Sequence, residues 1–168
     1  LETFQQVFNM AQASGNRRQE GHSIYGLGDV HLRQNRYAPQ VECVEAAMVV
    51  ARELGDRQRE GICLGRLGEV HMRQGRMDEA RAHFEASLAM AREVGDPHNE
   101  SAWLGYLGYV YRNQGCYPEA VEHTEQALAI SRDAGSGQLE SWCLDNLAKL
   151  YMRQNRMLEA QAQFEAAL

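Results

Sequence analysis

The sequence predicts an all-α solenoid, in which antiparallel helix pairs stack one after another. Three observations indicate this fold: an internal repeat of 40 residues, apolar residues at helical spacing in both halves of each repeat, and glycine or asparagine between the halves. Aligned without a gap, residues 21–60 and 61–100 are identical at 16 of 40 positions. Chance does not give so dense a match, so the chain is built from copies of one unit.

The repeat defines the organisation of the chain. Residues 1–168 form a single solenoid, because every segment fits the same 40-residue register. The full repeats are predicted at 21–60, 61–100 and 101–140, followed by a truncated repeat at 141–168. Residues 1–14 correspond to the second helix of a preceding repeat, since Phe4 aligns with Phe84. The missing initiator methionine indicates an excerpt from a longer protein.

Each repeat divides into two amphipathic helices. In the first half of the second repeat, Leu64, Leu67 and Val70 recur at three-residue spacing, and in the second half Ala80 and Phe84 are four residues apart. Glycine, asparagine, aspartate and proline at the boundaries favour helix ends and starts. Helices are expected at 17–34, 38–54, 57–74, 78–94, 97–114, 118–134, 138–154 and 158–168.

Glycines in the middle of the first helices indicate close helix packing. Gly28, Gly68 and Gly108 occupy one register, although glycine in a helix costs about 1 kcal/mol relative to alanine. A close approach of the second helix explains this cost. The small residues at one register of that helix are expected to face the glycines; they are Ala47, Ser87 and Ala127.

Composition and charge exclude several function classes. The chain is 44% hydrophobic and 24% charged, which is typical of a soluble globular protein with a core. Its formal charge of −6 argues against nucleic acid and anionic membranes as partners. No apolar run is long enough to cross a bilayer.

The repeat resembles a known family. Leu64, Leu67, Gly68 and His71 in the first helix, with Ala80, Phe84 and Ser87 in the second, are similar to the tetratricopeptide repeat in its 40-residue variant. The resemblance implies a right-handed superhelix whose first helices line a concave groove. It also implies a non-enzymatic scaffold that binds a protein or peptide. Similar repeats occur in spindle-orientation scaffolds and beside nucleotide-switch modules in bacterial regulators.

The face of the first helices opposite the core predicts the binding residues. Tyr106, Tyr109 and Trp142 would be apolar anchors, and arginines would select the carboxylates of an acidic peptide. The candidate residues are Tyr25, Arg33, Arg66, Arg73, Tyr106, Tyr109, Arg112, Trp142, Asn146 and Arg153. In the alternative interpretation Trp142 packs on its neighbour, and the arginines form a solvated edge that pairs with Asp29 and Glu69.

The shape and charge of the predicted groove limit its ligands. Gly65 and Gly105 would leave a shallow wall that admits a bulky partner such as a helix. The family's pocket for the C-terminal carboxylate of heat-shock chaperones needs lysine and asparagine. Here Asp29 and Glu69 would repel that carboxylate, so this ligand is excluded.

Motifs for enzymes, metals and cofactors are lacking. The sequence contains no H-E-x-x-H, P-loop, G-x-S-x-G or C-x-x-C pattern. His31 and His71 share a register with Tyr111 and Tyr151, which indicates positions at the edge of the core. We therefore expect no catalysis, cofactor or metal site, and the unpaired cysteines indicate a reducing, cytoplasmic compartment.

Two functions follow from this pattern. The first is a protein-interaction scaffold that binds a peptide or helix in its concave groove. The alternative is the sensor region of a larger bacterial multidomain regulator, which binds a peptide or associates with itself. Self-association is expected because a solenoid without polar caps exposes apolar ends, here Phe4, Phe8, Phe164 and Leu168.

Overall fold

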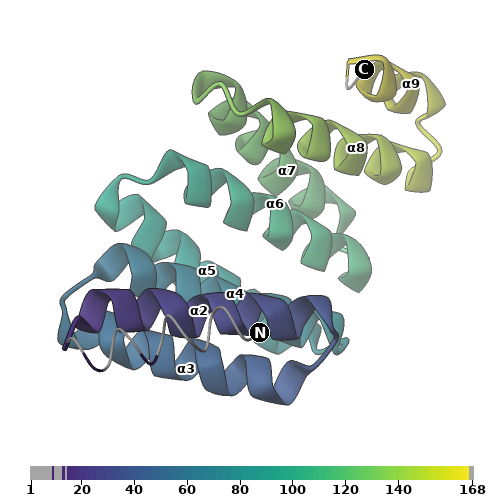
Figure 1. The fold of residues 1–168 in the computed structure, drawn as a ribbon. Coiled ribbons are helices and arrows are strands. Elements are labelled where there is room, and N and C mark those ends of the chain that lie inside the picture. Colours follow the sequence, from purple (N-terminus) through teal and green to yellow (C-terminus); the bar gives the residue numbers. More distant parts are fainter. Residues whose placement is uncertain (1–8, 10–12, 14, 167–168) are drawn as a thin grey trace.

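The computed structural model describes residues 9, 13 and 15–166 and forms a helical solenoid in this part of the chain (Figure 1). The helices are α2 (Arg17–Arg33), α3 (Tyr37–Glu53), α4 (Arg57–Arg73), α5 (Met77–Val94), α6 (Pro97–Gln114), α7 (Tyr117–Asp133), α8 (Gly137–Arg153) and α9 (Met157–Ala166). These described residues contain no strand. Up to residue 166, each helix begins and ends within one residue of its predicted bounds. The helix predicted at 1–14 falls almost wholly outside the described residues.

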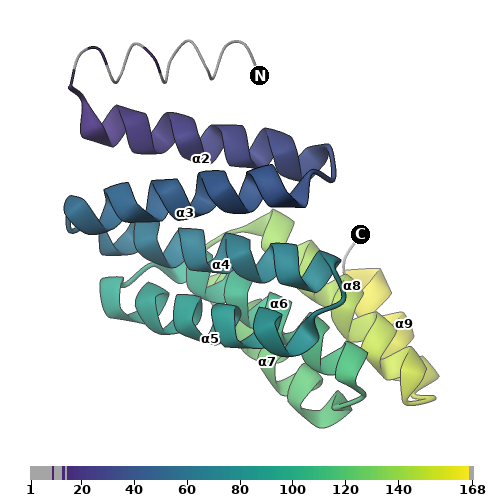
Figure 2. The ribbon, with the colours of Figure 1, turned by 90° about the horizontal axis from the view of Figure 1, so that it is seen from below.

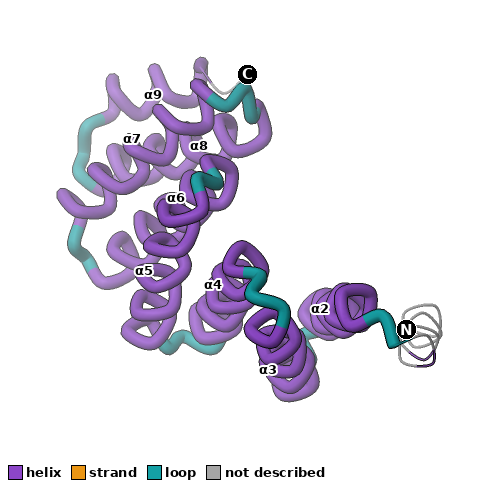
Figure 3. The backbone as a smooth tube through the Cα atoms, turned by 90° about the vertical axis from the view of Figure 1, so that its left-hand side faces the viewer, coloured by secondary structure: helices purple, strands orange, loops and turns teal. Residues whose placement is uncertain are grey.

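The helices form two layers that follow one curve. Each helix packs against the next one in the chain, so that neighbours form antiparallel hairpins (Figure 2). Seen along the stack, α2, α4, α6 and α8 lie on the inner side of the curve, and α3, α5, α7 and α9 lie on the outer side (Figure 3). The predicted all-α solenoid of antiparallel helix pairs is confirmed.

Local sequence signals define the helix starts. Asn16, Asp56 and Asp96 each cap a first helix, because the side-chain oxygen accepts a hydrogen bond from the backbone N–H three residues later, at 3.0–3.1 Å. A cap of this kind contributes about 1 kcal/mol. Between the two helices of a repeat, Asn35 and Asn155 adopt positive φ where other repeats carry glycine. The predicted capping and turn residues are thus confirmed.

A periodic ion pair connects consecutive repeats. Near the end of each second helix an arginine contacts the glutamate in the first turn of the next helix. The pairs are Arg52–Glu60 at 2.7 Å, Arg92–Glu100 at 2.8 Å and Arg132–Glu140 at 2.8 Å. All three arginines are about half exposed, so each pair adds little stability. The pairs explain why glutamate recurs at this register of the repeat.

The mid-helix glycines allow close helix packing, but their neighbours differ from the prediction. A methyl group on Gly68 would lie 2.8 Å from the Phe84 ring, and one on Gly108 would lie 2.3 Å from the Thr124 hydroxyl. A methyl group on Gly28 would lie 3.4 Å from Cys43 and 3.5 Å from Val44, so the packing is looser there. The expectation that Ala47, Ser87 and Ala127 face the glycines is wrong. The helices cross about one turn nearer the N-terminus of the second helix.

A buried hydroxyl links the two helices of a repeat. It comes from the second helix in one repeat and from the first helix in the next. In the second repeat Ser87 donates a hydrogen bond to the backbone carbonyl of Gly61. In the third repeat the equivalent residues are Ala127 and Ser101, and Ser101 donates to the carbonyl of Ala127 at 2.8 Å. One buried hydroxyl therefore joins the same two positions in both repeats.

The core has two parts. The larger cluster extends from Ala80 on α5 to Ala160 on α9, and the smaller one joins α2, α3 and α4 around Val44 and Cys63. On the inner side α4 approaches α6, and α6 approaches α8, more closely than α2 approaches α4. The first inter-repeat junction is therefore packed less tightly. No helix in the described part of the chain is long and apolar enough to cross a membrane.

Candidate functional site

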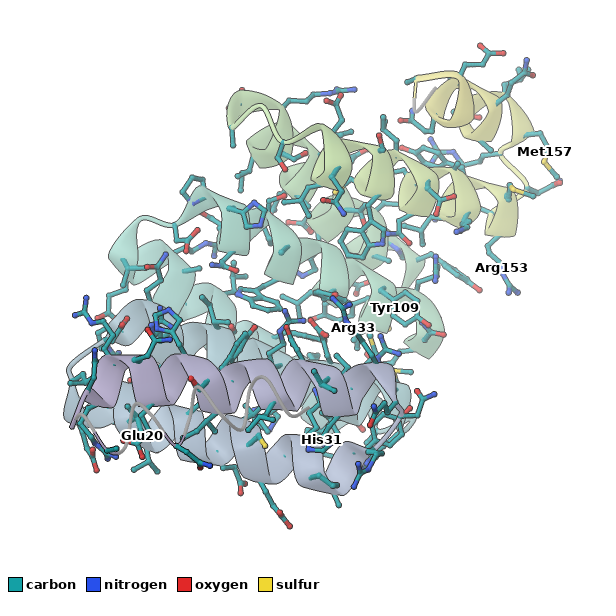
Figure 4. The ribbon with its side chains drawn as sticks, in the orientation of Figure 1. Glu20, His31, Arg33, Tyr109, Arg153 and Met157 are labelled. Atoms are coloured by element: carbon teal, nitrogen blue, oxygen red, sulfur yellow. The ribbon has the colours of Figure 1, made fainter. Side chains whose placement is uncertain are left out.

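All ten predicted site residues lie on the inner helices. Tyr25 and Arg33 are on α2, and Arg66 and Arg73 are on α4. The other six are Tyr106, Tyr109 and Arg112 on α6 and Trp142, Asn146 and Arg153 on α8. Figure 4 marks Arg33, Tyr109 and Arg153 on three different inner helices. Their contacts divide the ten residues into an internal group and an accessible group.

A polar network occupies the inner side of α2 and α4. The Arg66 Nε donates to the Tyr25 hydroxyl at 2.6 Å, and its Nη1 donates to both carboxylate oxygens of Glu69 at 3.0 and 3.1 Å. The Asp29 carboxylate lies 3.7 Å from Arg66 Nη2. Glu69 is 4% exposed. Tyr25 and Arg66 are thus held by partners within the chain.

The pKa values of this network follow from burial and charge. Burial disfavours the charged form of Arg66, but the neighbouring Glu69, Tyr25 and Asp29 outweigh it, so that the pKa of Arg66 is raised. For the Tyr25 hydroxyl, burial disfavours the charged form and so raises the pKa. The guanidinium therefore stays charged and the phenol stays neutral at ordinary pH.

Aromatic rings from α5, α6 and α8 pack against one another. Tyr106 stacks on Phe84 with ring centroids 5.0 Å apart, and its centroid lies 5.8 Å from that of Trp103. Trp142 lies tilted against Tyr106 at 5.2 Å. Burial raises the pKa of the Tyr106 hydroxyl. Tyr106 and Trp142 remain half-buried, so they present only part of their rings to a partner.

The expected shallow wall at Gly65 and Gly105 is wrong. A methyl group on Gly65 would lie 2.3 Å from the Trp103 ring, and one on Gly105 would lie 2.1 Å from the Trp142 ring. Tryptophans of the following repeat therefore fill the space that each glycine leaves. The sequence alone did not show this, because Trp103 and Trp142 occupy different registers of the repeat.

A cationic hollow lies between the C-terminal ends of α6 and α8. It has a volume of about 640 Å³ and is lined by Arg112, Asn113, Gly115, Tyr117, Lys149, Met152 and Arg153. Three of the lining residues are cationic and none is acidic. Lys149 pairs with Asp145 one turn away, outside the lining. The hollow combines positive charge with the apolar surface of Tyr117 and Met152.

Neighbouring side chains fix Arg112 at the edge of this hollow. Its guanidinium carbon lies 4.7 Å from the centre of the Tyr109 ring, a cation–π contact. Its Nη1 donates to the Asn146 side-chain oxygen at 3.2 Å. The Asn146 amide donates in turn to the Trp142 carbonyl at 3.0 Å. Three predicted residues, Tyr109, Asn146 and Trp142, thus orient a fourth, Arg112.

The remaining arginines are exposed. Arg33, Arg73 and Arg153 are all accessible on the described surface. The alternative interpretation paired the arginine edge with Asp29 and Glu69, but both of those carboxylates contact Arg66 instead.

Of the seven lining residues the sequence prediction contained only Arg112 and Arg153, and it missed the two apolar side chains Tyr117 and Met152. Tyr117 begins the outer helix α7, so a search of the inner-helix face could not include it. Met152 lies in the last turn of α8, one residue before Arg153. Proximity of the α6–α7 turn to the end of α8 brings both residues to the hollow, and the repeat pattern does not encode this proximity.

The histidines and cysteines form packing contacts. His71 stacks on His83 with centroids 5.0 Å apart, and Tyr111 stacks on His123 at 5.1 Å. Within the described residues no group of three metal-ligating side chains converges. All four cysteines are free; Cys63 and Cys143 are buried, as their shared register predicts.

Comparisons with known proteins agree with this architecture. The family model of the tetratricopeptide repeat matches residues 41–93, 62–104 and 99–168. No curated protein matches the chain.

Solved structures share the fold at low identity. BtubC (BKLC) from P. vanneervenii is 17% identical with a TM-score of 0.78, over 99% of this chain and 77% of that one. The TPR domain of Arabidopsis FLU is 22% identical with a TM-score of 0.63, over 66% and 93%.

A third structure is a much longer protein. The signal transduction ATPase with a tetratricopeptide repeat sensor from Pyrococcus horikoshii is 18% identical with a TM-score of 0.77, over 90% of this chain and 24% of that one. This chain thus spans about a quarter of that protein. The repeat register, the two-layer solenoid and the matching family model lead to one assignment: the chain belongs to the tetratricopeptide repeat family.

Proposed function

We propose that this chain is a protein-interaction scaffold that binds an acidic segment of a partner protein on its inner helices. Tetratricopeptide repeats are generally non-catalytic interaction scaffolds, which supports the general function. The observation that carries the specific proposal is the hollow between α6 and α8, with Arg112, Lys149 and Arg153 in its lining. Because the whole chain is acidic, this local excess of positive charge favours carboxylates at one place.

The geometry suits a carboxylate more than a purely apolar ligand. Arg112 is already oriented by Tyr109 and Asn146, so that binding costs little side-chain entropy. Arginine can hold a carboxylate with two parallel hydrogen bonds. Tyr117 and Met152 add apolar surface beside the charges. An extended segment with acidic and apolar residues would therefore match both parts of the hollow.

A hexaglutamate peptide labelled with a fluorophore tests this proposal by anisotropy. We expect it to bind the wild-type chain more tightly at low salt than at high salt, because exposed charges are screened. The double variant Arg112→Gln/Arg153→Gln should weaken binding by about tenfold. Arg36→Gln, which removes a positive charge from the turn between α2 and α3, is the matched control and should bind like the wild type.

Two results would contradict the proposal. One is equal binding of hexaglutamate by the wild type and the Arg112→Gln/Arg153→Gln variant, when circular dichroism shows that both proteins are folded. The other is equal binding of labelled hexalysine, which carries the opposite charge.

The second candidate is a sensor region within a larger regulator. The similarity to the tetratricopeptide sensor of the P. horikoshii ATPase favours it, since this chain matches only 24% of that protein. The proposed hollow would then receive an acidic segment from another domain or from a signalling peptide. The Arg112→Gln/Arg153→Gln substitutions can be tested in the larger regulator that this candidate assumes. A change in the activity of that regulator would support the sensor, whereas a loss of binding to an external partner alone would support the scaffold.

Self-association and location are further parts of the proposal. Met157 and Leu158 on α9 are 57% and 82% exposed, which supports contact with a second copy. The predicted end residues Phe4, Phe8 and Leu168 lie outside the described residues, as does the Phe164 side chain. Light scattering over a wide concentration range tests the contact, and Leu158→Glu should reduce the average mass. The four free thiols support a cytoplasmic location.

A further inference from the structure

A second concave site lies where the first two repeats meet, away from the cationic hollow. It is formed by α2, α3 and α4 (Figure 2) and has a volume of about 100 Å³. Its lining residues are Arg18, Gly21, Tyr25, Ala47, Val50, Ala51, Leu54, Arg59, Ile62 and Cys63. We propose that this pocket binds a small monocyclic aromatic carboxylate, with the ring inside the pocket and the carboxylate at its two arginines.

The floor of the pocket is apolar and buried. Ala47, Val50, Ala51 and Cys63 are each at most 5% exposed. Burial raises the pKa of the Cys63 thiol to about 11, so the floor carries no charge at neutral pH. Apolar pockets of this kind bind aromatic rings; an engineered cavity of roughly 150 Å³ takes up benzene. An opening to solvent lets a ring of that size enter here with its substituent outside.

The repeat itself indicates which group fits the space. Forty residues further on, a pocket that shares most of the equivalent positions encloses only about 10 Å³, and Trp103 stands there where the first junction has Cys63. An aromatic side chain of the protein thus closes the equivalent space at the second junction. At the first junction the aromatic residue of the pair is Tyr25, at the register of Gly65, and it lines the pocket without closing it. The vacant volume is that of an aromatic ring.

The mouth of the pocket is cationic. Arg18 is exposed and has no ion-pair partner among the described residues. Arg59 is held in place by Asp56 at 3.1 Å and also contacts His22. At the second junction the equivalent residues are Gln58 and Asn99, which are neutral. The open pocket at the first junction therefore has arginines at its mouth, whereas the filled space at the second junction has neutral residues at the same positions.

Both properties together select the ligand class. The ring gains free energy by leaving water, and the carboxylate finds two guanidinium groups at the mouth. A cationic amine with the same ring would meet repulsion from both arginines. A larger polycyclic molecule exceeds the volume. Benzoate-like or phenylacetate-like molecules remain.

Calorimetric titration with phenylacetate and phenethylamine tests the proposal. The two probes share a phenyl ring and carry opposite charges. We expect phenylacetate to bind one site per chain, and to bind at least fivefold more tightly than phenethylamine. Arg18→Gln, which copies Gln58 of the next repeat, should remove most of this difference. Arg33→Gln, at the other end of α2, is the matched control and should bind phenylacetate like the wild type.

A second variant tests the pocket and not its charge. Tyr25→Gly/Cys63→Trp copies the Gly65–Trp103 pair into the first junction, and it should abolish phenylacetate binding. Retained binding in this variant would overturn the assigned site. Absence of phenylacetate binding to the wild type at millimolar concentration, or equal binding of the two probes, would overturn the proposal itself. If the double variant does not fold, the Arg18→Gln and Arg33→Gln pair still decides the outcome.

Discussion

The ring of Trp103 lies directly over the backbone of Gly65, so that a methyl group at Gly65 would be 2.3 Å from the ring. Trp103 belongs to the third repeat and Gly65 to the second. Trp142 covers Gly105 in the same way at the next junction. Each pair joins two inner helices, and the missing side chain of the glycine makes room for the tryptophan.

Gly65→Ala should therefore destabilise the protein. The added methyl group must displace Trp103, which is 4% exposed and packed against Phe84 and Tyr106. Overpacking of this kind costs about 1–3 kcal/mol, which exceeds the gain in helix propensity of about 1 kcal/mol. We expect the free energy of unfolding in urea to fall by about 1 kcal/mol.

Gly137→Ala provides the matched control. Gly137 begins α8, and nothing lies within 4 Å of a methyl group placed there. The same substitution should leave the free energy of unfolding unchanged or raise it slightly. Equal effects at Gly65 and Gly137 would show that helix propensity, and not contact with Trp103, determines the cost.

The repeated features of the fold could be predicted from the sequence, because one physical requirement recurs in every copy. Asp56 and Asp96 cap helices in equivalent turns, and Ala80 and Ala120 are buried at equivalent positions. A 40-residue period therefore predicts helix bounds, layer order and the inner face. Contacts that occur only once follow from differences between repeats, and these a period does not reveal.

The candidate site shows where such prediction ends. Arg66 and Tyr106 have the right position and chemistry for a partner, but Glu69 and Phe84 of the same chain contact them first. Side-chain directions and distances across a helix junction determine whether such a residue contacts its own chain or stays accessible to a partner. Arg112 is accessible at the hollow because its partners, Tyr109 and Asn146, leave the rest of its guanidinium uncovered.

Gln40 should be replaceable with a gain in stability. It is fully buried, and neither atom of its side-chain amide has a hydrogen-bond partner among the described residues. An unsatisfied buried polar group costs about 1–3 kcal/mol. Gln40→Met keeps the volume and removes the polar group, so we expect the free energy of unfolding in urea to rise by about 1 kcal/mol.

Gln40→Ala separates polarity from volume. The other repeats have alanine at this position, and the second repeat fills the space with Phe84 four residues later, where this repeat has the smaller Val44. Truncation here leaves a cavity, which reduces or cancels the gain. A stabilising effect of Gln40→Ala as large as that of Gln40→Met would contradict this view of the packing.

The stacked pair His71–His83 should make stability depend on pH. Burial lowers the pKa of both imidazoles, and Arg76 lowers that of His71 further. As the pH falls below about 6.5, the unfolded chain takes up protons before the folded chain does. Stability is therefore complete above this pH and decreases as the pH falls. Urea unfolding at a series of pH values measures the decrease.

His71→Tyr should reduce this pH dependence, because it copies the Tyr111–His123 stack with one titrating ring fewer. His31 and His123 also have lowered pKa values through burial, so part of the dependence will remain. The reciprocal variant, Tyr111→His, creates a second histidine pair and should lose stability more steeply in acid. Parallel curves for the two variants would argue against the stacked pair as the cause.

The buried carboxylate of Glu69 should matter more for stability than any exposed ion pair in the described chain. Its side chain is 5% exposed, and Arg66, which binds both of its oxygens, is 27% exposed. Glu69→Leu leaves the Arg66 guanidinium without its main partner in a partly desolvated place, which we expect to cost about 2 kcal/mol. The double variant Arg66→Met/Glu69→Leu removes both charges and should recover at least half of this loss. Urea unfolding of the two single variants and the double variant gives the coupling free energy between the residues. Additive effects would mean that Asp29 and Tyr25 hold Arg66 equally well without Glu69, and the network would then have no central pair.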